Sequence, residues 1–96
     1  MPTLTHSGLR HYFRVEGTPD RQPLVLVHPI GADHGIWDSV MPTLLEGFQV
    51  LRYDIRGHGG TETPPQRVTL EELSSDLLHL THAMGWERFN ACGLSI

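Results

Sequence analysis

Cysteine, long apolar runs and basic residues are all scarce in this sequence of 96 residues. The single cysteine, Cys92, excludes a disulfide within the chain and fits a reducing cytoplasm. The longest apolar run is far too short to span a membrane, and the N-terminus lacks the basic and apolar regions of a signal peptide. Lys plus Arg is 7 against 11 acidic residues, so the net charge is −4 and the dispersed signs leave no basic patch. We therefore expect a cytoplasmic protein without nucleic-acid or membrane partners.

Three segments have the composition of strands in a parallel sheet. Residues 23–27 form a continuous apolar run, which fits a strand buried on both faces. Residues 49–54 and the short segment 88–92 are predicted as two further strands. A helical pattern separates each pair, and this alternation favours right-handed crossovers and an α/β fold.

The two helical patterns differ in how clearly they begin and end. The first has an apolar stripe that we expect to pack on the sheet, made of Trp37, Val40, Met41, Leu44, Leu45 and Phe48. Pro42 is tolerable only near the first turn of this helix. The second runs from about Leu70 to Met84, opens with a capping box of Thr69 and Glu72, and stops at Gly85. Its predicted buried face consists of Leu70, Leu73, Leu77, Leu80 and Met84.

The first fifteen residues have a different pattern. Residues 4–6 and 10–15 flank a Ser7-Gly8 turn, and the second segment alternates with period two, so we predict an antiparallel hairpin at a sheet edge. Residues 16–22 and 61–67 are polar or proline-rich and are predicted loops. No repeat or linker divides the chain.

The sequence ends in Cys92-Gly93-Leu94-Ser95-Ile96, which matches the start of a G-x-S-x-G nucleophile elbow. In such an elbow a strand turns sharply into a helix, and the serine hydroxyl is exposed at the tip. A bare G-x-S is weak evidence because glycine and serine also make ordinary turns. Here the motif directly follows a predicted parallel strand, which is the context that the elbow requires.

Four motifs taken together resemble the α/β-hydrolase fold. They are His28-Pro29-Ile30-Gly31, Trp37-Asp38, Arg52-Tyr53-Asp54-Ile55-Arg56-Gly57-His58-Gly59, and the elbow at residues 92–96. Within that fold the chain is most similar to 3-oxoadipate enol-lactonases. Esterases, C–C bond hydrolases and cofactor-free haloperoxidases share the motifs and remain alternatives, as does a non-catalytic fragment or binding module. The resemblance implies that residues 1–96 are the N-terminal portion of one incomplete α/β-hydrolase domain, with a hairpin followed by parallel strands and crossover helices.

The same resemblance implies roles for individual residues. Ser95 corresponds to the nucleophile that attacks an ester or lactone carbonyl and forms an acyl-enzyme. The backbone N–H groups of Ile30 and Ile96 correspond to the oxyanion donors. Pro29 departs from the common H-G-x-G form, but the expected donor is the next residue. Trp37 is a candidate wall of the substrate pocket or a core residue, and no metal or cofactor is implied.

The catalytic acid and base are expected outside this sequence. In this fold the triad follows the order Ser, Asp or Glu, His, and both partners lie well beyond the elbow. We therefore expect a complementary C-terminal segment to supply the aspartate and the histidine. Without a histidine base a serine hydroxyl is a poor nucleophile, so residues 1–96 alone are expected to be inactive, with the last strand's flank exposed.

The remaining polar residues receive structural interpretations. We interpret His28 as ordering its loop, and Asp54 and Arg56 as holding the turn that follows the second parallel strand by local hydrogen bonds and an ion pair. His58 has no assigned role. His79 and His82 are interpreted as a solvated helix face rather than a metal pair, because no third ligand has suitable spacing. Cys92 is interpreted as a packing residue.

Overall fold

The computed structural model describes residues 3–64 and 68–94. Its strands form one sheet in the order β1-β2-β4-β3-β5. Their bounds are β1 Thr3–His6, β2 Leu9–Glu16, β3 Gln22–Val27, β4 Phe48–Tyr53 and β5 Asn90–Gly93. β1, β2 and β4 pair antiparallel, whereas β3 runs parallel to both β4 and β5. The predicted α/β class, with a hairpin followed by parallel strands, is confirmed.

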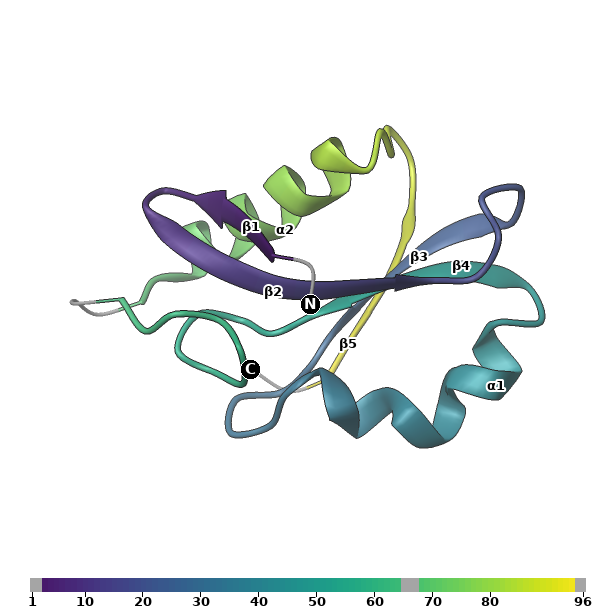
Figure 1. Cartoon of the computed structure of the whole chain (residues 1–96), viewed down its shortest axis with the longest axis horizontal. Coiled ribbons are helices and arrows are strands. Elements are labelled where there is room, and N and C mark those ends of the chain that lie inside the picture. Colours follow the sequence, from purple (N-terminus) through teal and green to yellow (C-terminus); the bar gives the residue numbers. More distant parts are fainter. Residues whose placement is uncertain (1–2, 65–67, 95–96) are drawn as a thin grey trace.

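The hairpin at the sheet edge is closed by the predicted two-residue turn. His6 pairs with Leu9, and the intervening Ser7 and Gly8 have φ values of 52° and 78°. Positive φ at both central positions is typical of the tight turns whose twist matches that of the flanking strands. The hairpin therefore lies at one edge of the sheet and β5 lies at the other (Figure 1).

Helix α2, Leu70–Ala83, begins and ends as the sequence predicts. Thr69 Oγ1 accepts a hydrogen bond from Glu72 N–H, and the Glu72 side chain accepts one from Thr69 N–H, which completes the capping box. Gly85 follows with a φ of 76°, the left-handed conformation that ends many helices. The predicted buried face is wrong at one residue, because the side chain of Leu70 in the first turn is 67% exposed.

The first predicted helix is two shorter pieces. Residues His34–Val40 form the 3₁₀ helix η1, and Met41–Leu44 form the single-turn α1. Pro42 has no N–H to donate to Asp38, and its ring disfavours a continuous α-helix across that point. Met41 N–H instead bonds back to Asp38 and Trp37 carbonyls. The apolar stripe is broken as a result, so Val40 is exposed and Phe48 belongs to β4.

The side chains of β3 and β4 alternate between two apolar clusters, one on each face of the sheet. Leu24, Leu26 and Val50 pack with Trp37 and Met41 on the η1 and α1 side. On the α2 side, Val25, Leu51, Tyr53, Ile55 and Leu80 form the buried part of the second cluster. Figure 1 shows α2 on one side of the sheet and α1 on the other, which is why the run 23–27 is apolar at every position.

Strand β5 differs from the other parallel strands because all four of its residues are exposed. Within the described residues it pairs only with β3. Cys92 is exposed there, so its interpretation as a packing residue is wrong for this part of the chain, because an edge strand lacks a neighbour on one side. An uncovered edge of this kind presents unpaired backbone N–H and C=O groups to a further strand.

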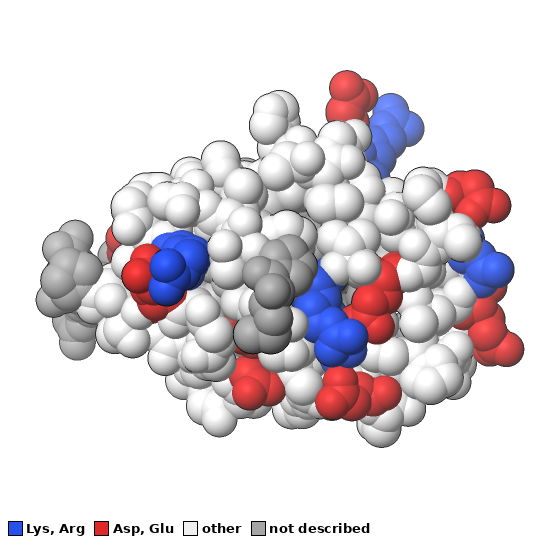
Figure 2. Space-filling model, in the orientation of Figure 1, with Lys and Arg blue, Asp and Glu red and all other residues white. Residues whose placement is uncertain are grey.

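The surface shows no continuous basic patch on the face drawn in Figure 2, where Arg side chains lie beside acidic ones. Arg10 pairs with Glu62 at 3.8 Å, and Arg14 pairs with Glu16 at 3.7 Å. None of the helices within 3–64 and 68–94 has the length and apolarity needed to cross a membrane.

Candidate active site at the carboxyl edge of the sheet

Two of the sequence motifs leave the sheet side by side. Val27, the last residue of β3, pairs with Gly93, the last residue of β5, and Leu94 N–H donates to the Val27 carbonyl at 3.3 Å. The loop that begins at His28 and the end of β5 at Gly93 and Leu94 therefore share one edge of the sheet (Figure 1). Ligands of open α/β sheets bind at this carboxyl edge. Ser95 and Ile96, the predicted nucleophile and one predicted oxyanion donor, lie outside the described residues.

Ile30 lies in a tight turn at this edge. Ala32 N–H donates to the Pro29 carbonyl at 3.2 Å, and Gly31 has a φ of 90°. That combination is typical of a type II turn with Ile30 at the second position and glycine at the third, where only positive φ fits. The Ile30 side chain is 62% exposed, and no hydrogen bond engages its N–H within the described part of the chain. The role of this N–H as an oxyanion donor stays a prediction.

His28 is fully buried and orders the loop, as the sequence analysis proposes. Its Nδ1–H donates to the Pro29 carbonyl at 2.8 Å, and its Nε2 accepts from Ile55 N–H at 3.0 Å. Both ring nitrogens are thus occupied by backbone groups, with Nδ1–H as the donor and Nε2 as the acceptor. A proton-carrying role would require one of these bonds to break.

Asp54 holds the loop after β4, in agreement with the structural interpretation. Its buried carboxylate accepts hydrogen bonds from His34 N–H at 2.7 Å, His34 Nδ1 at 2.8 Å and Gly60 N–H at 2.8 Å. Asp33, His34 and Asp54 also place ligand-type atoms within 4.8 Å of one another. Asp33 accepts from Gly35 N–H as the cap of η1, so these carboxylates are already engaged in holding backbone.

Arg56 forms the predicted ion pair, but its partners lie in α2 and not within the turn. Its guanidinium forms a bidentate pair with Asp76 of α2, at 2.6 Å from Nε and 3.1 Å from Nη2, and it bonds Glu72 at 2.9 Å. Both partners belong to α2, whose apolar side chains pack against Tyr53 and Ile55 at the end of β4. The pair therefore anchors the loop to α2 instead of closing the turn by itself.

Asp76 and His11 are buried ionisable residues in contact with each other, and the sequence patterns did not predict this pair. Asp76 is 2% exposed, and its carboxylate lies 3.0 Å from Nε2 of the equally buried His11. Burial alone would raise the pKa of Asp76, but the adjacent His11 ring and the hydrogen bonds from Arg56 more than offset it and the pKa is lowered. The sequence did contain a signal, because Asp76 is a charged residue that lies between Leu73 and Leu77 of the predicted apolar helix face.

Trp37 packs in the core cluster beneath β3 and is only 8% exposed. Its indole N–H is buried and has no hydrogen-bond partner within residues 3–64 and 68–94. A buried indole N–H usually finds a partner. The structure thus brings Trp37 against the sheet, and its role as a pocket wall stays a prediction.

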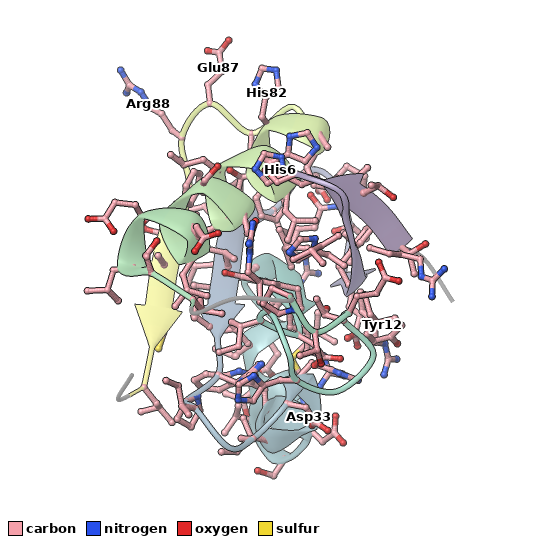
Figure 3. The ribbon with its side chains drawn as sticks, turned by 90° about the vertical axis from the view of Figure 1, so that its left-hand side faces the viewer. His6, Tyr12, Asp33, His82, Glu87 and Arg88 are labelled. Atoms are coloured by element: carbon pink, nitrogen blue, oxygen red, sulfur yellow. The ribbon has the colours of Figure 1, made fainter. Side chains whose placement is uncertain are left out.

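His79 and His82 do not act as a pair. The His79 ring stacks on His6 with centroids 4.2 Å apart, while His82 is exposed and points away from α2 (Figure 3). His6 also bonds Ser75 at 2.8 Å, and its pKa is lowered by burial and by the neighbouring His79. The solvated interpretation therefore holds for His82, whereas His79 is covered by His6.

The fold and the motifs at its carboxyl edge define an α/β protein in which the loop after β3 lies beside the end of β5. Residues 22–96 match the family described as alpha/beta hydrolase fold. The chain is 30% identical over 83 residues to 3-oxoadipate enol-lactonase 1 of Acinetobacter baylyi, a match that covers 86% of this chain and 31% of that protein.

Two solved structures show the same likeness in three dimensions. The enol-lactonase from Burkholderia xenovorans LB400 has a TM-score of 0.94 and 35% identity, covering 98% of this chain and 37% of that one. A hydrolase from Pseudomonas aeruginosa PA01 has a TM-score of 0.95 and 38% identity, with 98% and 36% covered. The chain belongs to the α/β-hydrolase fold family, and it spans about a third of the length of these relatives.

Proposed function

We propose that this chain is the N-terminal portion, residues 1–96, of a single α/β-hydrolase domain that cleaves carboxylic esters or lactones. The observation that carries the proposal is the parallel pairing that ends at Val27 and Gly93. It brings the turn at Ile30, whose N–H has no hydrogen-bond partner among residues 3–64 and 68–94, beside the end of β5, from which the sequence continues with Ser95 and Ile96. An oxyanion donor and a serine nucleophile need to meet at such a place.

The proposed chemistry is acyl transfer through Ser95. Its Oγ attacks the carbonyl carbon, its proton passes to a histidine base, and the N–H groups of Ile30 and Ile96 stabilise the oxyanion. The leaving oxygen departs with a proton returned by the same histidine, and water then cleaves the acyl-enzyme. The likeness to enol-lactonases supports 3-oxoadipate enol-lactone as the substrate. In this proposal the reaction belongs to the breakdown of aromatic compounds and takes place in the cytoplasm.

The acid and base come from a complementary C-terminal segment in this proposal. The exposed edge of β5 supports it, because a further parallel strand of that segment would pair with this edge. Exposed apolar side chains of α2 support it as well, since Leu70 and Leu78 are 67% and 59% exposed. Residues 1–96 by themselves are then inactive.

The test replaces Ser95 by alanine in the complete protein, which includes the complementary segment. Hydrolysis of 3-oxoadipate enol-lactone and of a simple aryl ester should fall by about 10⁴-fold or more. Ser75→Ala, a serine of α2 that bonds His6, is the matched control and should leave both rates unchanged. Unchanged hydrolysis in Ser95→Ala would overturn the proposal.

The same assay separates the alternative functions. A perhydrolase would use Ser95 and the same two amides but would turn over faster with peroxide than with water. A non-catalytic binding module would show no Ser95-dependent turnover with either nucleophile.

A further inference from the structure

The two peptide groups on either side of Ile30 are each held by a histidine. On the first, the Pro29 carbonyl accepts from His28 Nδ1–H, and the N–H on the opposite side of the same planar peptide belongs to Ile30. On the second, Gly31 N–H donates to His58 Nε2 at 3.0 Å. Both torsions of Ile30 are therefore restrained, and so is the direction in which its N–H points.

His58 is set up to accept and not to donate at Nε2. Its Nδ1–H donates to the Arg56 carbonyl at 2.9 Å, which leaves Nε2 without a proton in the neutral ring. The ring also lies 5.3 Å from the His28 ring, centroid to centroid, at a tilt of 51°. The backbone that carries His58 is itself held, because Arg56 is anchored on the buried Asp76.

A type II turn leaves the N–H of its third residue without a partner inside the turn. In this chain that residue is Gly31, whose own conformation is the least restricted of the turn. Water could satisfy the N–H equally well in energy, but it would not fix a direction. A side-chain acceptor on a neighbouring anchored loop does fix it.

We propose that His58 is a positioning residue for the reaction, which holds the Ile30–Gly31 peptide so that the Ile30 N–H is aimed at the oxyanion. The inference rests on the proposed function, in which Ile30 supplies that N–H. His58 acts through the turn and does not touch the substrate. Because removal of an oxyanion donor costs about 10²–10³-fold in kcat, misdirecting one should cost about 10-fold to 100-fold.

The experiment uses three variants of the complete protein. His58→Asn keeps a donor near the position of Nδ1 but has no atom at Nε2, whereas the longer side chain of His58→Gln can place an amide oxygen there. His82→Asn, on the exposed side of α2, is the control. The measurements are kcat and KM for aryl ester hydrolysis and the amide exchange rate of Gly31 by NMR.

The expected result is a 10-fold to 100-fold lower kcat for H58N with KM nearly unchanged, faster exchange at Gly31, and substantial recovery of both in H58Q. H82N should match the wild type. Normal kcat in H58N, or equal losses in H58N and H58Q, would overturn the inference while Ser95→Ala still tests the proposed function separately. If H58N does not fold, the ¹⁵N–¹⁵N coupling across the Gly31–His58 hydrogen bond decides instead, and its absence overturns the inference.

Discussion

The carboxylate of Asp76 is the group whose loss should cost the protein most stability. It lies between α2, the loop after β4 and strand β2, and it accepts two hydrogen bonds from Arg56 while His11 Nε2 lies 3.0 Å away. Both partners are nearly inaccessible to water, with Arg56 5% and His11 1% exposed. Asp76→Asn removes the negative charge with almost no change in volume, so the effect is electrostatic and not a cavity.

The loss in the free energy of unfolding depends on the buried charge of Arg56, which remains after the substitution. Breaking a buried ion pair by removing one partner costs about 3–5 kcal/mol, because the other charge stays buried and unpaired. Arg56 retains one partner, Glu72 at 2.9 Å, whose side chain is 31% exposed. We therefore expect Asp76→Asn to lower the free energy of unfolding by about 3 kcal/mol, near the low end of that range.

Urea unfolding of the complete protein, followed by circular dichroism at pH 7, measures this change as a shift of the midpoint. Asp38→Asn is the matched control, because Asp38 also pairs with a buried arginine, Arg52, but is 69% exposed. The control should shift the midpoint far less, since exposed ion pairs contribute little. Equal shifts for the two variants would refute the reasoning that burial of the carboxylate sets the cost.

Three further predictions concern acid, a glycine and a helix cap. The pKa of Asp76 is lowered from 3.8 in the folded protein, so its contribution to stability should be complete above pH 3.8 and should be lost as the pH falls through the lower pKa of the folded state. The free energies of unfolding of wild type and Asp76→Asn should therefore converge in acid. Gly59→Ala should destabilise the protein by about 1–3 kcal/mol more than Gly8→Ala. Both glycines have positive φ, but of the two only Gly59 would place a Cβ 2.3 Å from Asp54 Oδ2, where it would disturb the hydrogen bonds of that carboxylate. Equal urea midpoints for the two variants would contradict this. Thr69→Ala should cost about 1 kcal/mol through loss of the capping box, and an unchanged thermal midpoint would show that tertiary contacts alone hold the start of α2.

Local patterns account for the parts of the fold that were predicted correctly. The apolar run 23–27 indicates a strand covered on both faces, and Thr69, Glu72 and Gly85 mark the ends of α2 within one turn. These signals act between neighbours in the sequence, through side-chain periodicity and hydrogen bonds that span three or four residues. The positions of Val40 and Leu70 were missed because whether an apolar side chain is covered depends on elements far away in the chain.

The sequence by itself determined the α/β class, the tight turn before the second strand, the capped helix, and the motifs that mark the hydrolase family. Only the tertiary structure decided that β2 and β3 both flank β4, that Arg56 and His11 both reach Asp76, and that His58 holds Gly31 beside Ile30. The physical reason is that polar side chains choose partners by where the folded backbone brings them. Gly31 and His58 are 27 residues apart, and no sequence pattern indicates that they are in contact.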